Sequence, residues 1–262
     1  MAHVANVGVH PVKALSRIDV NAARVTAGGV LADDRKYALF TDDGDAINGI
    51  ETPRVHDVDA SYDFESEVLT VATDEGERRR FDLRADPEEA AAWFSEFLGK
   101  TVTIRRDPVD GFVSRPEAGP SVVSTATLEE VASWFDDVTA PELGRRLRVN
   151  VEVGGVPAFW EDRFVGEGAP AFEVGGVRFE GIEPCARCVI PERDPDTGER
   201  TEGFRETFVE RREATFPEWA DFDAFGHYYR LMLIAAVPEE SRGETVRVGD
   251  DVTVVDAVEP CE

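Results

Sequence analysis

The sequence predicts a mainly β protein made of two β-barrels with peripheral helices. Short runs of β-rich or alternating residues recur along the chain, and turn sequences such as Gly-Gly, Asp-Asp-Gly and Asp-Glu-Gly separate them. The 262 residues are 42% hydrophobic and include 16 Phe and 4 Trp, which is enough apolar surface for one or two cores. We therefore expect a globular chain of the barrel class.

The first half contains six predicted strands, at residues 3–9, 18–26, 37–41, 68–73, 79–84 and 102–106. A helix is predicted to begin at Pro87, because Asp86 is a suitable N-cap and proline fits the first helical position. Its apolar face runs through Trp93, Phe94 and Leu98. We expect residues 1–110 to form an N-terminal β-barrel domain against which this helix packs.

The segment 107–120 is rich in Pro, Gly and charge and is predicted to link this domain to a second one at residues 111–262. Thr127 and Glu130 have the spacing of a capping box for a helix through Val131 and Trp134, and a short helix is predicted at 141–147. Further strands are predicted at 148–153, 171–174, 177–182, 231–237 and 251–255. The turn at 248–250 before the last strand is typical of a barrel that closes on itself.

The charge of the chain indicates its habitat. There are 54 acidic and 28 basic residues, a formal net charge of −26, and Lys occurs only at Lys13, Lys36 and Lys100. An acidic surface poor in lysine suits a cytoplasm of very high salt, where screening removes the repulsion between carboxylates. We predict an extreme halophile as the source. The same charge argues against a nucleic-acid groove, which would need a basic stripe.

The sequence has neither a basic and apolar leader nor an apolar run of 18 residues, so we expect a cytoplasmic protein without a membrane span. We also expect it to be a monomer. Its three cysteines are an odd number and do not indicate a disulfide framework. We expect their thiols to be reduced.

Two of those cysteines, Cys185 and Cys188, form a Cys-x-x-Cys pair that contains Arg187 and precedes a turn-forming Asp-Pro-Asp-Thr-Gly at 194–198. A neighbouring guanidinium favours the thiolate, which is both a nucleophile and a ligand for soft metals. Zinc would need two more ligands, and Cys261 and the four histidines show no suitable spacing. A dithiol redox couple would need a helix after the pair, and a calcium loop would need a later glutamate. Cys185 alone could be a small buried side chain.

Four segments in order resemble the MOSC family. They are Gly-Val-His-Pro-Val-Lys-Ala-Leu at 8–15, Asp-Asp-Arg-Lys-Tyr-Ala-Leu at 33–39, Leu-Arg-Val-Asn-Val at 147–151, and the cysteine pair with its following turn. That family includes the C-terminal domain of molybdenum-cofactor sulfurases and the amidoxime-reducing components. The resemblance spans nearly the whole chain and implies a MOSC-associated N-terminal β-barrel followed by a MOSC domain.

The resemblance also implies a molybdenum-cofactor site. Cys188 would be the catalytic residue and the metal ligand. The residues implied to contact the cofactor are Lys13 and Arg35 at its phosphate and pterin edge, Ala186 and Arg187 at the pterin, and Ser124, Thr125, Arg148 and Asn150 around the same ligand. A molybdopterin carries a phosphate and a dithiolene, so fixed cations and bidentate donors suit it. From the residues alone, Lys13 and Arg35 could be surface charges, and Arg148 and Asn150, two apart on an expected strand, could mark a solvated face.

Three positions depart from the family pattern. Ala14 stands where serine is frequent, Val149 where the reductases commonly have proline, and Pro191-Glu192-Arg193 where Thr-Thr-Val is usual. The last of these could reshape the mouth through which a substrate enters.

The implied activity is the reduction of an N-oxygenated small molecule by a molybdenum-dependent reductase. Because the chain has no iron–sulfur, flavin or nicotinamide motif, we expect its electrons to come from a separate protein. The alternative is a sulfur carrier, or a cofactor-binding protein, that holds a persulfide on Cys188. In cofactor sulfurases such a domain follows a pyridoxal-phosphate desulfurase, which 262 residues cannot also accommodate.

The charge pattern yields a prediction about salt. Raising KCl from 0.1 M to 1 M shortens the Debye length from about 10 Å to about 3 Å and so weakens repulsion between surface carboxylates. The melting temperature should therefore rise over this range, which differential scanning calorimetry would measure. A melting temperature that falls with salt would contradict the halophile interpretation.

Overall fold

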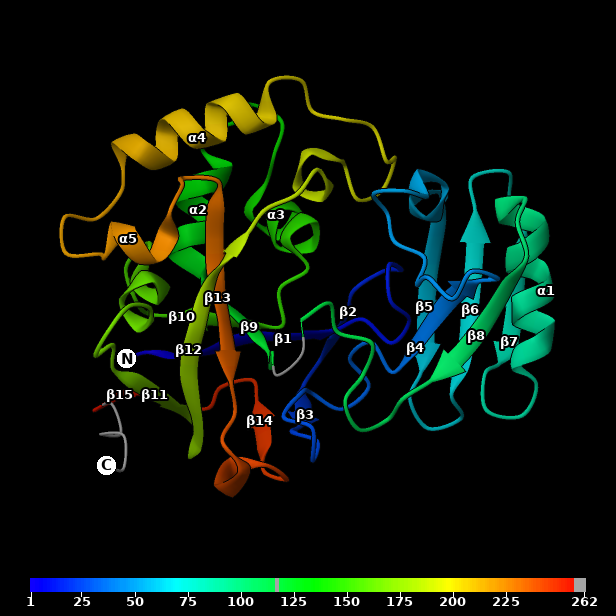
Figure 1. Ribbon diagram of the computed structural model, residues 1–262, viewed down its shortest axis with the longest axis horizontal. Coiled ribbons are helices and arrows are strands. Elements are labelled where there is room, and N and C mark those ends of the chain that lie inside the picture. The colour runs from blue at the N-terminus through cyan, green and yellow to red at the C-terminus, as the bar shows by residue number, and fades with distance from the viewer. Residues whose placement is uncertain (116–117, 257–262) are drawn as a thin grey trace.

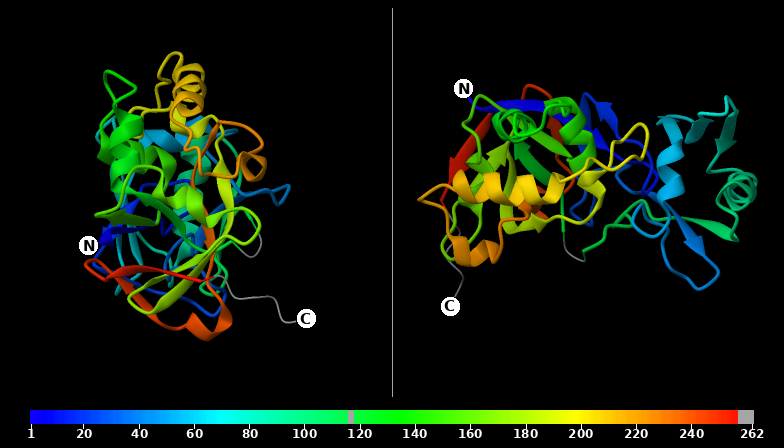
Figure 2. Two further views of the ribbon diagram at one scale, coloured as in Figure 1. Left: turned by 90° about the vertical axis from the view of Figure 1, so that its left-hand side faces the viewer. Right: turned by 90° about the horizontal axis from the view of Figure 1, so that it is seen from above.

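The computed structural model describes residues 1–115 and 118–256 and shows a mainly β protein with two parts (Figure 1). The larger part holds an eight-stranded sheet and most of the helices, and the smaller part holds further strands and one long helix. Seen from above, the two parts lie side by side along the long axis of the molecule (Figure 2). None of the described helices is both long and apolar enough to cross a membrane.

The eight-stranded sheet combines strands from both ends of the chain. Its order is β15 (Val252–Val255), β11 (Ala171–Val174), β12 (Val177–Ala186), β13 (Arg230–Ala236), β9 (Ser121–Ser124), β10 (Val151–Gly154), β1 (His3–Val9) and β2 (Ile18–Val20). The pairing is antiparallel except between β9 and β10, which run parallel. Strands on both sides of residue 110 therefore share one sheet and one core of valines and phenylalanines.

The two ends of this strand series meet. The Val4 amide donates to the Asp250 carbonyl at 2.9 Å, and the Val252 amide donates to the Ala2 carbonyl at 3.0 Å. Beside this junction, β14 (Thr245–Arg247) pairs with β3 (Ala22–Arg24). The predicted mainly β class is confirmed, whereas closure of the sheets into barrels stays a prediction.

Helices cover the larger sheet. They are α2 (Thr125–Ala132), α3 (Ala140–Leu147), α4 (Phe204–Ala214) and α5 (Phe222–Phe225), with 3-10 turns η2 (Trp160–Phe164), η3 (Ile190–Glu192) and η4 (Glu239–Ser241). Phe204 of α4 stacks on Phe135 with ring centroids 4.4 Å apart, which fixes α4 over the end of α2. The predicted cap of α2 is wrong: Ser124, at the end of β9, is the N-cap, and its hydroxyl accepts from the Thr127 amide at 2.9 Å.

The smaller part contains β5 (Val58–Asp63), β6 (Val68–Thr73) and β7 (Arg78–Asp82) in one sheet, and β4 (Tyr37–Thr41) paired with β8 (Val102–Arg106). The turn η1 (Pro53–Asp57) precedes β5. Helix α1 (Pro87–Leu98) begins as predicted, since the Asp86 carboxylate accepts from the Glu89 amide at 3.2 Å. Phe94 and Leu98 bury its apolar face in the local core.

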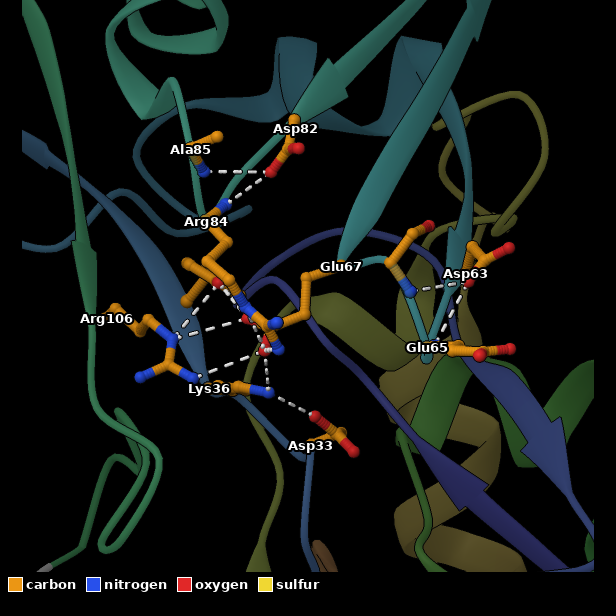
Figure 3. A network of polar contacts seen from close by, with 11 residues as sticks. Asp33, Lys36, Asp63, Glu65, Glu67, Asp82, Arg84, Ala85 and Arg106 are labelled. Atoms are coloured by element: carbon orange, nitrogen blue, oxygen red, sulfur yellow. Dashed lines mark hydrogen bonds and ion pairs between the residues drawn. The ribbon is translucent and has the colours of Figure 1, made fainter.

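One buried carboxylate ties this part together (Figure 3). Glu67 is 2% exposed and accepts hydrogen bonds from Tyr37 on β4, Arg106 on β8 and Arg84 after β7, and Lys36 lies 3.2 Å away. Although burial opposes ionisation, these donors hold the pKa of Glu67 below its ordinary range. Burial and Glu67 together raise the pKa of Tyr37 to about 12. Lys36 is therefore committed to this network.

A second buried carboxylate lies at the junction of β9 and α2. Glu161 is 1% exposed, and its Oε2 accepts from the Ser124 amide at 3.2 Å and the Thr127 hydroxyl at 3.1 Å. Its Oε1 has no partner within residues 1–115 and 118–256. Burial, with the neighbouring Asp162, raises the pKa of Glu161 to about 8. Burial therefore favours the neutral form of this side chain.

We predict that Glu161→Gln removes a pH dependence of stability. Because the folded pKa lies above the unfolded value, the wild type loses stability as pH rises from about 4.5 through 8, by at most about 1.4 kcal/mol per pH unit. The free energy of unfolding, measured by urea denaturation at pH 5, 6.5 and 8 in constant KCl, should fall less in the variant. Glu129→Gln, at an exposed position of α2, is the control. A wild-type minus Glu161→Gln difference that stays flat with pH would refute the assignment.

Candidate functional site

A cavity of about 250 Å³ lies between the loops that follow β1 and precede β4, the end of α3 and the end of β12. Its lining includes Lys13, Arg35, His56, Arg115, Arg148, Asn150, Arg187, Cys185 and Cys188. No Asp or Glu is among the described residues of that lining, although acidic residues outnumber basic ones 54 to 28 in the chain. The cavity is therefore a positive site in a strongly negative protein.

Backbone hydrogen bonds position the two loops that carry Lys13 and Arg35. The Lys13 amide donates to the Tyr37 carbonyl at 2.8 Å, and the Arg35 amide donates to the His10 carbonyl at 2.6 Å. Arg35 has a φ of 53° and Ala14 a φ of 73°, in the left-handed region that side chains disfavour. Four of the seven described non-glycine residues with positive φ line this cavity. Such strained backbone clusters at functional sites.

Arg148 corrects one prediction. The sequence predicted it on a strand with Asn150, but it is the C-cap of α3, with a φ of 58°, and β10 begins only at Val151. Its Nη1 donates to the Leu15 carbonyl at 2.9 Å, which joins α3 to the loop of Lys13. Its Nη2 is buried and has no hydrogen-bond partner among the described residues. The left-handed cap turns this guanidinium toward the cavity, as a strand would not.

The three cations Lys13, Arg35 and Arg148 repel one another. Burial, together with Arg35 and Arg148, lowers the pKa of Lys13, and burial lowers the pKa of Arg148 to about 9, so Arg148 stays charged at neutral pH. An anion bound here would relieve this repulsion and could accept from the unpaired Arg148 nitrogen.

His10 and Asp34 support this cluster from behind. The Asp34 Oδ1 accepts from the His10 amide at 2.8 Å and lies 3.2 Å from His10 Nδ1, and its Oδ2 accepts from Arg35. Burial and Arg148 lower the pKa of His10, so the ring is neutral and adds no charge. Both residues lie inside the segments quoted for the resemblance, but no sequence signal singled them out.

The cysteine pair lies at the other end of the cavity. Cys185 is near the end of β12 and 6% exposed, whereas Cys188 is exposed on the following loop. The Arg187 Nη1 lies 3.0 Å from the Cys185 Sγ, so the guanidinium that was expected to favour a Cys188 thiolate is directed at the other thiol. The loop is fixed by Tyr229, whose hydroxyl donates to the Cys188 carbonyl at 3.3 Å.

Three predicted residues do not line the cavity: Ser124, Thr125 and Ala186. Ser124 caps α2 and Ala186 ends β12. The Asn150 side chain does line the cavity, but its amide is engaged with the backbone, accepting from the Ser121 amide at 3.1 Å and donating to the Gly8 carbonyl at 3.0 Å. The predicted contacts of these residues with a cofactor stay predictions.

The thiols do not belong to a ready-made metal cluster. In the ranges that the structure describes, no group of three or more His, Cys, Asp or Glu side chains could hold a metal ion, and Cys261 lies outside those ranges. The turn predicted at 194–198 is present, with the Asp194 carboxylate accepting from the Asp196 amide at 2.8 Å. A metal at Cys188 would need its other ligands from a bound group.

Comparison with known families gives two matches. The family model of the MOSC N-terminal beta barrel domain matches residues 1–101, and that of the MOSC domain matches residues 114–253.

Several curated proteins are similar to this chain. Mitochondrial amidoxime reducing component 2 of Macaca fascicularis is 27% identical, over 74% of this chain and 68% of its own length. The protein of the same name from Bos taurus is 25% identical, over 95% of this chain and 82% of its own length. The human molybdenum cofactor sulfurase is 20% identical over 80% of this chain, but only 28% of its own length is covered.

Proposed function

The chain belongs to the MOSC domain family, and from that premise we propose that it binds a molybdenum cofactor and reduces N-oxygenated compounds with electrons from a separate protein. The observation that carries the proposal is the cavity itself, which holds an exposed thiol, Cys188, and three cations, Lys13, Arg35 and Arg148, in one site. The location in the cytoplasm, the high-salt habitat, the monomeric state and the division into domains at residue 110 belong to the same proposal.

The residues present fit a molybdopterin. This group brings two sulfur ligands and a phosphate, so the protein needs to add only one soft ligand and a set of cations. Cys188 supplies the first, and the cluster of Lys13, Arg35 and Arg148 supplies the second. The buried Nη2 of Arg148 has no hydrogen-bond partner among the residues that the structure describes. A buried donor of this kind favours a ligand that completes it.

Each residue then has a definite role. Cys188 would ligate the metal, Lys13, Arg35 and Arg148 would hold the phosphate end, and Arg187 would contact the pterin. When bound, the cofactor supplies the two-electron, oxygen-atom chemistry, and the protein supplies binding and orientation. Ile190, Met232 and Ile234 add apolar side chains to the lining of the cavity.

The mouth of the site is the part that departs from the family pattern. Pro191 and Glu192 are in η3, and Glu192 accepts from Arg200, so this segment is folded back and fixed. Ile190, immediately before them, lines the cavity. We propose that 191–193 shapes the substrate entrance.

A sulfur carrier is the second candidate. The exposure of Cys188 suits a persulfide that must reach an acceptor, and one relative is a cofactor sulfurase. The two functions differ in metal content. Protein produced at high salt in a host that makes molybdenum cofactor should contain molybdenum close to one per chain if it is a reductase. A carrier would instead release sulfide on treatment with a reductant and contain little molybdenum.

We predict that Cys188→Ser abolishes molybdenum-dependent reduction of an amidoxime and weakens cofactor retention, whereas Cys185→Ser is milder. A serine oxygen is a harder and poorer ligand than a thiolate. Activity and molybdenum content, by plasma mass spectrometry, would be measured on the same preparations. Equal losses in the two variants would indicate a dithiol couple or a shared site, and full activity of Cys188→Ser would remove the proposed ligand.

A further prediction concerns the cation cluster. Lys13→Ala, Arg35→Ala and Arg148→Ala should each lower cofactor occupancy about tenfold or more when cofactor is limiting, because a charge-assisted hydrogen bond contributes about 1.5–3 kcal/mol. Occupancy would be followed by pterin fluorescence, with circular dichroism as the check on folding. Lys100→Ala is the matched control, since Lys100 donates to Thr52 at 3.1 Å and does not line the cavity. Wild-type occupancy in all three variants would show that the site is misplaced.

A further inference from the structure

The cavity has a second positive region, separate from the cluster of Lys13, Arg35 and Arg148. At the cysteine end, Arg115 Nη1 lies 3.6 Å from the Cys185 Sγ, and Arg187 Nη1 lies 3.0 Å from the same sulfur. Arg187 also donates to the Leu147 carbonyl at 3.2 Å, which holds it in the wall. Arg115 differs, because its side chain is 38% exposed and so faces both the cavity and the solvent.

Arg115 is held in place, although it lies in the segment that links the two halves. The Phe112 amide donates to the Arg35 carbonyl at 2.8 Å, and the Gly119 amide donates to the Ala235 carbonyl at 2.8 Å. A Cβ at Gly119 would lie only 2.7 Å from that carbonyl oxygen, so glycine permits the close approach. Phe112 and Gly119, in the described stretches on either side, are thus each hydrogen-bonded to another part of the protein.

Its charge is only partly neutralised. The Arg115 Nε lies 2.8 Å from Glu183, but the same carboxylate also pairs with Arg230 at 3.3 Å. Two guanidiniums therefore share one carboxylate, which does not line the cavity. Among the described residues, the cavity lining at this end carries Arg115 and Arg187 and no carboxylate, and it includes Cys188.

We propose that Arg115 forms an anion subsite at the mouth of the cavity, which selects substrates that carry a carboxylate besides the N–O bond. This inference rests on the proposed function, because it names the class of substrate for the same site. The bidentate fork of arginine matches a carboxylate, and the Glu183 contact orients the fork. The guanidinium is a specificity determinant and takes no part in the oxygen-atom chemistry.

Arg115 could instead have a purely structural role, in which its ion pair with Glu183 only holds the loop in place. Arg230 offers a matched control, because it pairs with the same carboxylate and donates to the Pro184 carbonyl at 2.8 Å but does not line the cavity. Arg115→Met and Arg230→Met each remove one guanidinium that pairs with Glu183. Only Arg115→Met also removes a guanidinium from the lining of the cavity.

The test compares two probes of nearly equal shape, benzamidoxime and 4-carboxybenzamidoxime, on the cofactor-loaded protein in constant KCl. The wild type should prefer the carboxylate probe about fivefold to tenfold in kcat/KM, through a lower KM. Arg115→Met should reduce this preference to about one by raising the KM for the carboxylate probe, and Arg230→Met should keep it. The proposal would be overturned by any of three results. The wild type could show no preference for the carboxylate probe, Arg115→Met could retain that preference, or both variants could lose it equally.

Binding gives a readout that does not depend on turnover. Calorimetry with 4-carboxybenzamidine and benzamidine, the corresponding amidines, should show the same preference in the wild type and in Arg230→Met, and its loss in Arg115→Met. If neither amidoxime is reduced, the proposed activity fails, and the calorimetric preference still decides whether Arg115 is an anion subsite.

Discussion

The side chain of Asn150 joins three strands that are far apart in the sequence. Its amide accepts from Ser121 at the start of β9 and donates to Gly8 in β1, while its own backbone leads into β10. Lys13 follows Gly8 by one short loop, and Arg148 immediately precedes this junction. A neutral amide, hydrogen-bonded through both its oxygen and its nitrogen, thus aligns the segments that carry two of the cations. The rest of the candidate site depends on that alignment.

Holding like charges together requires compensation from the surrounding structure. Asp34 is the buried carboxylate that faces Arg35, and the neutral ring of His10 fills the space behind it without adding charge. In a chain with so many acidic residues, more carboxylates could have neutralised the cavity, yet none lines its described part. Lys36, next to Arg35 in sequence, is directed away by Glu67. The protein keeps positive charge unbalanced at one place, which is the condition for binding an anion.

The sequence predicted the class of fold and most long elements, because alternation and the Asp86-Pro87 cap are local signals. It missed β5, whose exposed positions are Asp59, Ser61 and Asp63, residues with low or modest β propensity. It also missed α4, which begins after Gly203 without a side-chain cap. Six of the predicted site residues line one cavity. Arg115 and Asp34 escaped notice because their roles depend on contacts between distant segments.

The pairing of β1 with β10 limits how this family can be recombined. Matches to two family models suggest two modules, but β1 belongs to the first match and its partner strand to the second. A chimaera joined in the 107–120 segment would bring a β1 from one parent against a β10 from the other, with the Gly8 and Asn150 contact spanning the seam. Such a chimaera would contain a mismatched β1–β10 interface inside the main sheet. Substitutions in the loops around the cavity, by contrast, leave this strand pairing intact.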